Sequence, residues 1–167
     1  MQQLLAELQN RLPRVLFEAG DAFYWSPQHS KVVYNQSLPQ DSQPSWSLLH
    51  EAAHAMLDHQ SYAYDLELVL LEVEAWNKAK QLGEELGITI QDDHVQDCLD
   101  TYRDWLHQRS TCPRCGTVSL QMASSQYQCH NCLAEWSVSA SRFCRPYRLS
   151  GKQIKKSPKA IPQATFQ

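Results

Sequence analysis

The chain has 167 residues, of which 43% are hydrophobic and five are Trp, so the composition excludes a disordered protein and favours one folded domain with a small appendage. The net charge of −3 is unevenly divided, because residues 1–110 carry −10 and residues 111–167 carry +7. No apolar run approaches the ~20 residues that span a bilayer, and no basic segment precedes an apolar run at the start, so we expect a soluble, cytoplasmic protein with no membrane partner.

The first part of the chain predicts a helix followed by a small sheet. Leucines and a valine recur at helical spacing over residues 2–18, and Pro13 marks a bend or a break. Residues 22–25 (AFYW) and 31–34 (KVVY) are aromatic and β-branched runs, which predict the two strands of a hairpin. The polar residues 35–45, with two prolines, predict a loop that leads into the next helix.

Three helices are expected in the middle of the chain. The first covers residues 46–58, and the second begins with Asp65 as its N-cap and ends just before Gly87. The third begins near Asp92 and carries an apolar stripe. Because Cys98 falls on that stripe, we interpret it as a core thiol.

Residues 48–59, LLHEAAHAMLDH, contain the pattern His-Glu-x-x-His. Residues four apart share one helix face, so His50 and His54 can offer two imidazole nitrogens to one Zn²⁺. Glu51 lies ~100° around the helix, where it can take a proton from water at the metal. The alternative is an amphipathic helix with two surface histidines. The position of the pattern on a predicted helix favours the metal site.

A catalytic zinc needs a third protein ligand and an open position. The extended pattern of the metzincins requires a histidine six residues after His54, and this chain has Gln60 there. His59 follows His54 by five residues, which turns it away from the metal face of a helix. We therefore expect His59 at the helix end or on the substrate side.

The next helix offers three carboxylates. Glu72 shares its face with Ala75 and Ala79, small residues that allow close approach, so it is the favoured ligand. Glu74 stands four residues before a lysine, a spacing typical of an exposed ion pair. Glu67 is the third candidate.

HEAAHAMLDH followed by LEVEAWNKA resembles the ImmA/IrrE family of zinc metallo-endopeptidases, over about residues 23–79. The resemblance implies a zincin-like fold, an intracellular protein as substrate, and DNA-binding repressors as one class of such substrates. At Trp76 the chain departs from the family, which often has Asn or Asp there to hydrogen-bond a metal ligand. His59 matches the family's trailing histidine. The resemblance implies a general base and three zinc ligands, namely Glu51, and His50, His54 and Glu72.

Four of the six Cys form two C-x-x-C pairs separated by thirteen residues. In a cytoplasmic protein, cysteines are expected to be metal ligands or buried thiols rather than disulfides. The spacing predicts a closed, structural zinc site in a strand-rich ribbon that depends on the metal to fold. The alternative is four unrelated buried thiols. We interpret His130 as exposed and Cys144 as a spare thiol. The predicted ligands are Cys112, Cys115, Cys129 and Cys132.

The end of the chain is basic and contains three prolines and little periodicity, so we expect a flexible tail. Its charges, interleaved with two aromatic residues, can neutralise nucleic-acid phosphates, and the alternative is a solubilising tail or a contact with the acidic body. The residues expected to contact nucleic acid are Arg142, Arg145, Arg148, Lys152, Lys155, Lys156 and Lys159.

The sequence therefore predicts an α+β protein in three parts. Residues 1–110 form a mostly helical, zincin-like metallopeptidase domain with a small N-terminal sheet, residues 111–144 form the Cys₄ ribbon, and residues 145–167 form the tail. The predicted function is a zinc-dependent endopeptidase with one catalytic and one structural Zn²⁺. The candidates for stabilising the oxyanion are Tyr62, Tyr64 and His59.

Two alternatives remain open. SprT-like proteases also join H-E-x-x-H to a C-terminal zinc ribbon and act on proteins attached to DNA, although they usually take the third ligand from a downstream histidine. A non-enzymatic adaptor would bind a partner through the ribbon and tail and leave the histidine site idle. The presence of Glu51 argues against the adaptor, because an idle site needs no base.

Overall fold

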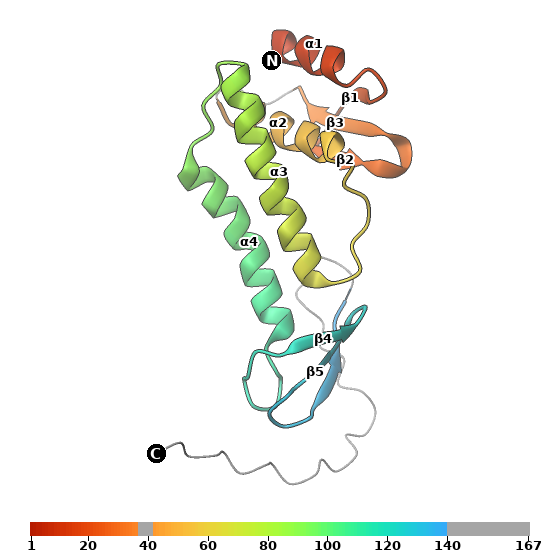
Figure 1. Cartoon of the computed structure of the whole chain (residues 1–167), viewed down its shortest axis with the longest axis vertical. Coiled ribbons are helices and arrows are strands. Elements are labelled where there is room, and N and C mark those ends of the chain that lie inside the picture. Colours follow the sequence, from red (N-terminus) through yellow and green to blue (C-terminus); the bar gives the residue numbers. More distant parts are fainter. Residues whose placement is uncertain (37–41, 140–167) are drawn as a thin grey trace. The chain divides into compact units, whose positions relative to one another are not determined.

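The computed structural model describes residues 1–36 and 42–139, which form four α-helices and two three-stranded sheets (Figure 1). The predicted α+β class is therefore confirmed. The chain divides into two compact units. The first comprises Met1–Ser61 and Leu70–Leu99, and the second comprises Tyr62–Val69 and the chain from Asp100 onward.

The first helix, α1, covers Gln2–Arg11 and buries Leu4 and Leu8. Of the two alternatives predicted at Pro13 for the segment of residues 2–18, a bend or a break, the structure has the break. Pro13 has no backbone N–H and stops the helix, so that the chain turns and continues as a strand. The apolar spacing continues past the proline by coincidence and does not indicate helix there.

The N-terminal sheet consists of β1 (Leu16–Gly20), β2 (Tyr24–Ser26) and β3 (Lys31–Asn35), in the order β1-β3-β2. β2 pairs antiparallel with β3, with Trp25 opposite Val32, and this confirms the predicted hairpin with slightly shifted bounds. β1 pairs in parallel with the other side of β3. β2 is therefore an edge strand. The backbone groups on its outer side do not pair within the sheet and can contact side chains of the helix that follows.

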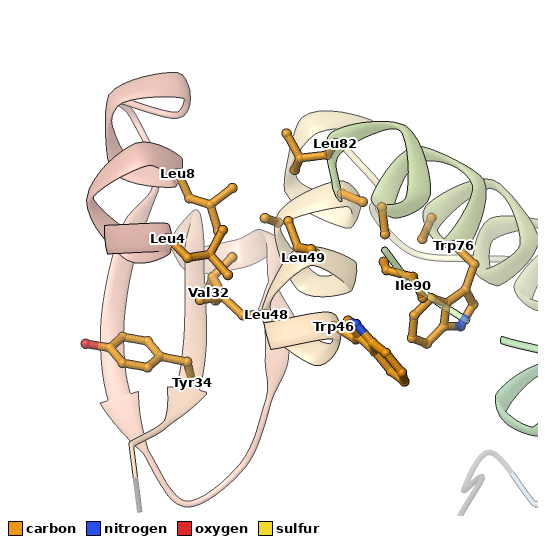
Figure 2. Packing of buried hydrophobic residues seen from close by; sticks show 14 of the residues in the cluster. Leu4, Leu8, Val32, Tyr34, Trp46, Leu48, Leu49, Trp76, Leu82 and Ile90 are labelled. Atoms are coloured by element: carbon orange, nitrogen blue, oxygen red, sulfur yellow. The ribbon is translucent and has the colours of Figure 1, made fainter. Parts of the chain in front are cut away.

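Helix α2 covers Ser42–Met56 and packs its apolar face into the core of the first unit. Figure 2 shows Leu4 and Leu8 of α1 beside Val32 of β3, and Trp46 of α2 beside Trp76 of the next helix. Because α2 packs between the sheet and the next helix, this packing fixes the positions of its polar residues. The largest fully buried apolar side chains of this core are Leu8, Val32, Leu48, Leu49 and Leu82.

Helix α3 covers Asp65–Glu85 and ends at the predicted stop. Gly87 has φ +70°, the left-handed conformation that glycine adopts most easily. The N–H of Ile88 donates to the carbonyl of Gly83 at 2.8 Å, and that of Gly87 donates to Glu84 at 3.2 Å. These are the two hydrogen bonds of a Schellman motif. Gly83 is also required, because a Cβ there would lie 2.5 Å from the carbonyl oxygen of Ile88.

Helix α4 covers Asp92–Ser110, and the Cys98 side chain on its first half packs against the core, as predicted. None of the helices among the described residues is long and apolar enough to cross a membrane.

The second unit contains an antiparallel sheet of β4 (Leu120–Ala123), β5 (Gln126–Gln128) and β6 (Glu135–Ser137). Tyr127 and Trp136 stack in its small core, with ring centroids 5.5 Å apart and an interplanar angle of 12°. Strand-rich structure is therefore present in the cysteine segment, as the sequence predicted.

Candidate metal centres

The first candidate centre joins two histidines of α2 to a carboxylate of α3 within the first unit. Nε2 of His50 lies 3.1 Å from Nε2 of His54. Oε2 of Glu72 lies 3.2 Å from Nε2 of His50, and Oε1 lies 3.7 Å from Nε2 of His54. All three side chains are buried. The structure thus brings together the three residues that the sequence favoured.

The spacing of these atoms fits a metal ion. Zinc at ~2.05 Å from tetrahedral ligands places neighbouring ligand atoms roughly 3.3 Å apart. The three observed separations, from 3.1 to 3.7 Å, surround that value. Oε2 of Glu72 is buried without a hydrogen bond from any of the described residues, and such an atom is costly unless a cation satisfies it. The donor set is therefore compatible with Zn²⁺.

Glu72 is held in the form that binds metal. Burial acts to raise the pKa of its carboxyl, but the contacts with His50 and His54 outweigh burial and lower the pKa to about 2. An ionised carboxylate needs no proton release before it coordinates.

Glu51 lies between α2 and the edge of the sheet. Its Oε2 accepts a hydrogen bond from the backbone N–H of Trp25 on β2, at 2.8 Å. Burial raises the pKa of Glu51, although the neighbouring His50 and His54 act in the opposite direction. A raised pKa brings a carboxylate closer to the range in which a general base works best at neutral pH.

The ring of Trp76 supports His50 directly. The two rings stack with centroids 4.2 Å apart and an interplanar angle of 26°. Nδ1 of His50 is buried and has no hydrogen-bond partner among the described residues. The ring of Trp76 therefore restricts the orientation of the candidate ligand His50 by stacking.

His59 lies just past the end of α2, as predicted. It does not point away from the metal face, because it is buried and its Nδ1 lies 2.9 Å from Nδ1 of His54. Its Nε2 lies 3.4 Å from Oε2 of Glu74. Glu74 is thus placed beside His59, and no ion pair joins it to Lys78 within the described part of the chain.

The other two groups of candidates have different surroundings. Oε2 of Glu67 accepts hydrogen bonds from the N–H groups of Ala63 and Tyr64, at 2.7 and 3.1 Å, so this carboxylate caps the start of α3. Tyr62 and Tyr64 are exposed in the connection before α3. With both ring nitrogens of His59 engaged, no described contact assigns an oxyanion stabiliser.

The second candidate centre consists of the four predicted cysteines, within the second unit. Sγ of Cys112 lies 3.6 Å from Sγ of Cys132, and Sγ of Cys115 lies 3.5 Å from Sγ of Cys129. Zinc bound tetrahedrally by thiolates at ~2.3 Å places the sulfurs roughly 3.8 Å apart. The separations fit that geometry, and they are far too long for disulfides.

Polar groups favour the thiolate by lowering the pKa of Cys115 and of Cys129, whereas burial raises the pKa of Cys132 to about 12. The N–H of Arg114 donates to Sγ of Cys112 at 3.4 Å, and that of Cys132 donates to Sγ of Cys129 at 3.5 Å. Hydrogen bonds from Thr117 lower the pKa of Cys115 to about 5. His130 is exposed, as predicted. The donor set is soft and closed, which is typical of zinc.

The remaining predictions fall elsewhere. Cys144 and the seven basic residues from Arg142 to Lys159 lie outside the described residues. Comparison with family models, curated proteins and solved structures finds no match for this chain.

Proposed function

We propose that this protein is a zinc-dependent endopeptidase. One observation carries the proposal: His50, His54 and Glu72 converge within ligand distance of one another, next to Glu51 on the same helix. Three protein ligands leave a fourth position open, as in catalytic zinc sites. The resemblance of residues 23–79 to the ImmA/IrrE pattern supports the same reaction and a zincin-like fold.

The residues of the chain have distinct roles in this proposal. His50, His54 and Glu72 would hold the metal, which supplies the Lewis acidity that polarises a peptide carbonyl and acidifies water. Glu51 takes the proton from the attacking water and later delivers it to the leaving amine. The hydrogen bond from the N–H of Trp25 to Oε2 of Glu51 fixes the orientation of the carboxylate in advance of the reaction.

The four cysteines serve a different purpose. Cys112, Cys115, Cys129 and Cys132 fill all four positions of a tetrahedral ion, which leaves none for a substrate. We assign this second zinc a structural role in the ribbon. The proposed substrate is an intracellular protein, with DNA-binding regulators as the class suggested by the family resemblance.

The proposal is tested in two steps. The zinc content of the purified protein is expected to be two ions per chain, and a His50→Ala/His54→Ala variant is expected to hold one. The wild type and a Glu51→Gln variant are then incubated with a library of quenched peptides and with unfolded protein substrates. Cleavage by the wild type alone supports the proposal. One zinc in both proteins, or equal cleavage by Glu51→Gln, contradicts it.

A further inference from the structure

His59 and Glu74 form an array behind one of the proposed zinc ligands. Nδ1 of His59 lies 2.9 Å from Nδ1 of His54, on the side of that ring opposite Nε2, and Nε2 of His59 lies 3.4 Å from Oε2 of Glu74. His59 is only 6% exposed, whereas the side chain of Glu74 is 63% exposed. A line of contacts thus runs from the surface to the back of the ligand.

The end of α2 places His59 there. The N–H of His59 donates to the carbonyl of His54 at 3.1 Å, and that of Asp58 donates to Ala55 at 3.3 Å. These are the hydrogen bonds of a Schellman motif, in which Asp58 takes the left-handed conformation at φ +52°. This motif usually packs an apolar side chain against the residue five positions earlier. Here both members of the pair are histidines.

A second anchor fixes the same segment. Nε1 of Trp25 donates to the carbonyl oxygen of His59 at 2.8 Å. The backbone of His59 is thus held at its N–H by His54 and at its C=O by β2. Because both of these backbone groups are hydrogen-bonded, the point at which the imidazole of His59 is attached has a fixed position.

The metal determines how protons are distributed along the array. Nε2 of His54 faces His50 and Glu72, so it must carry a lone pair to bind a metal, and its proton then sits on Nδ1. Nδ1 of His59 must accept that hydrogen bond, which puts the proton of His59 on Nε2. Nε2 then faces the carboxylate of Glu74, an acceptor. Each assignment follows from the previous one without conflict.

We propose that His59, supported by Glu74, is a positioning residue that fixes the tautomer and the ring orientation of the zinc ligand His54. This proposal rests on the zinc site of the proposed function. The other ligand differs, because His50 is held by the stacked ring of Trp76 and its Nδ1 has no partner among the described residues. The two histidine ligands are thus supported by different means, one by a hydrogen bond and the other by ring packing.

The test measures zinc affinity in the full chain by competition with a chelator. The His50→Ala/His54→Ala variant reports the cysteine site alone, so the contribution of the other site is obtained by difference. His59→Phe keeps a ring of similar size but cannot accept the hydrogen bond from His54. His59→Asn places its amide oxygen near the position of Nδ1 and can accept it. His29→Phe, at an exposed histidine of the first unit, is the matched control.

We expect His59→Phe to bind zinc about 10- to 100-fold more weakly, the range found when a partner of a ligand is removed. His59→Asn should recover part of this loss, and His29→Phe should bind like the wild type. The proposal is overturned if His59→Phe keeps the wild-type affinity. It is also overturned if His59→Asn is as weak as His59→Phe while all metal-free proteins unfold at the same temperature.

The same measurements separate the two proposals. If the wild type holds zinc only at the cysteines, the proposed function and this inference fail together. If His59→Phe weakens zinc binding and His59→Asn restores it, but no peptide or protein is cleaved, the positioning role stands and the peptidase fails.

Discussion

Arg109 and Asp65 form a buried, bidentate ion pair within the second unit. Nε of Arg109 lies 2.6 Å from Oδ2 of Asp65, and Nη2 lies 3.1 Å from Oδ1, with the two side chains only 2% and 4% exposed. The hydroxyl of Tyr127 donates to the same carboxylate at 2.5 Å, and the indole N–H of Trp136 donates to the carbonyl of Arg109 at 2.9 Å. One aspartate at the start of α3 therefore joins the end of α4 to the ribbon strands.

Replacing Arg109 by Met is expected to lower the free energy of unfolding by about 3–5 kcal/mol, because Asp65 would remain buried without its cation. Arg103→Met is the matched control on the same helix. Its pair with Asp100 is largely exposed and contributes less than about 1 kcal/mol. Urea unfolding of the zinc-loaded proteins gives both values. Equal losses in the two variants would show that the buried pair has no special weight.

Zinc removal is expected to disorder the ribbon but to leave the first unit folded. The ribbon core has few buried apolar residues, and two of those that it has are Cys112 and Cys129, so it depends on the metal. Near-ultraviolet circular dichroism should lose the signal of the stacked Tyr127 and Trp136 in Cys129→Ser. Cys98→Ser, outside the cysteine group, should keep both this signal and the zinc. An unchanged signal in Cys129→Ser would contradict the prediction.

Trp76 is expected to affect both stability and metal binding. Trp76→Ala should cost about 3–5 kcal/mol in the free energy of unfolding and weaken zinc binding, because the ring that supports His50 is lost. Phe17→Ala, in the same core, should cost a similar amount without weakening zinc, because Phe17 lies on β1, which supplies none of the candidate ligands. Thermal unfolding and chelator competition separate the two effects. If both variants bind zinc equally, the stacking has no role in holding the ligand.

Substitutions at Asp58 are expected to show that the turn that places His59 requires a left-handed backbone at this position. Its φ of +52° is unfavourable for a branched side chain and accessible to glycine. Asp58→Val should destabilise the protein by about 1–2 kcal/mol. Asp58→Gly should be close to neutral, because relief of the left-handed strain offsets the lost hydrogen bond from Gln60 and the added chain entropy. Differential scanning calorimetry decides, and a Val variant as stable as Gly would exclude the left-handed turn.

Glu72 gives a pH dependence to the metal-free protein. Its pKa of about 2 in the folded chain lies below the ordinary 4.5, so its ionised form stabilises the fold above about pH 4.5 and loses that effect as the pH falls toward 2. The shift corresponds to about 3 kcal/mol. The difference in unfolding free energy between the wild type and Glu72→Gln should therefore shrink over that interval.

Glu84→Gln, at an exposed position of the same helix, is the control for this titration. Its unfolding free energy should follow that of the wild type across the whole interval. A constant difference between the wild type and Glu72→Gln from pH 7 to pH 2 would show that Glu72 is not held ionised by the histidines.

The sequence predicts the residues of the two candidate metal centres because their spacing is local. His50 and His54 are one helical turn apart, and the paired cysteines are three residues apart, so each pair is juxtaposed by any structure of the right type. Glu72 is predicted because the small residues on its helix face, Ala75 and Ala79, allow close approach to another helix. In contrast, the parallel pairing of β1 with β3 joins segments that no periodicity relates, and the strand at Leu16–Gly20 was therefore missed.

The contact of His59 with His54 was missed for a different reason. Counting five residues from His54 around a helix turns His59 away, but the helix ends before that count is complete. The left-handed Asp58 reverses the chain and returns the ring of His59 to His54. An Asp directly after the apolar residues 55–57, followed by a residue able to pack against the helix, was the signal available in the sequence.

The hydrogen bond from Trp25 to Glu51 has a consequence for self-association. An edge strand exposes N–H groups that can pair with a strand of a second molecule, and such pairing leads to aggregation. β2 is only three residues long, Pro27 follows it at once, and Glu51 occupies the N–H of Trp25. By accepting this hydrogen bond, the Glu51 carboxylate therefore also keeps the N–H of Trp25 from pairing with a strand of a second molecule. Glu51→Gln keeps an oxygen acceptor for this N–H and Glu51→Ala removes it, so the amide is the substitution that tests chemistry without uncovering the edge.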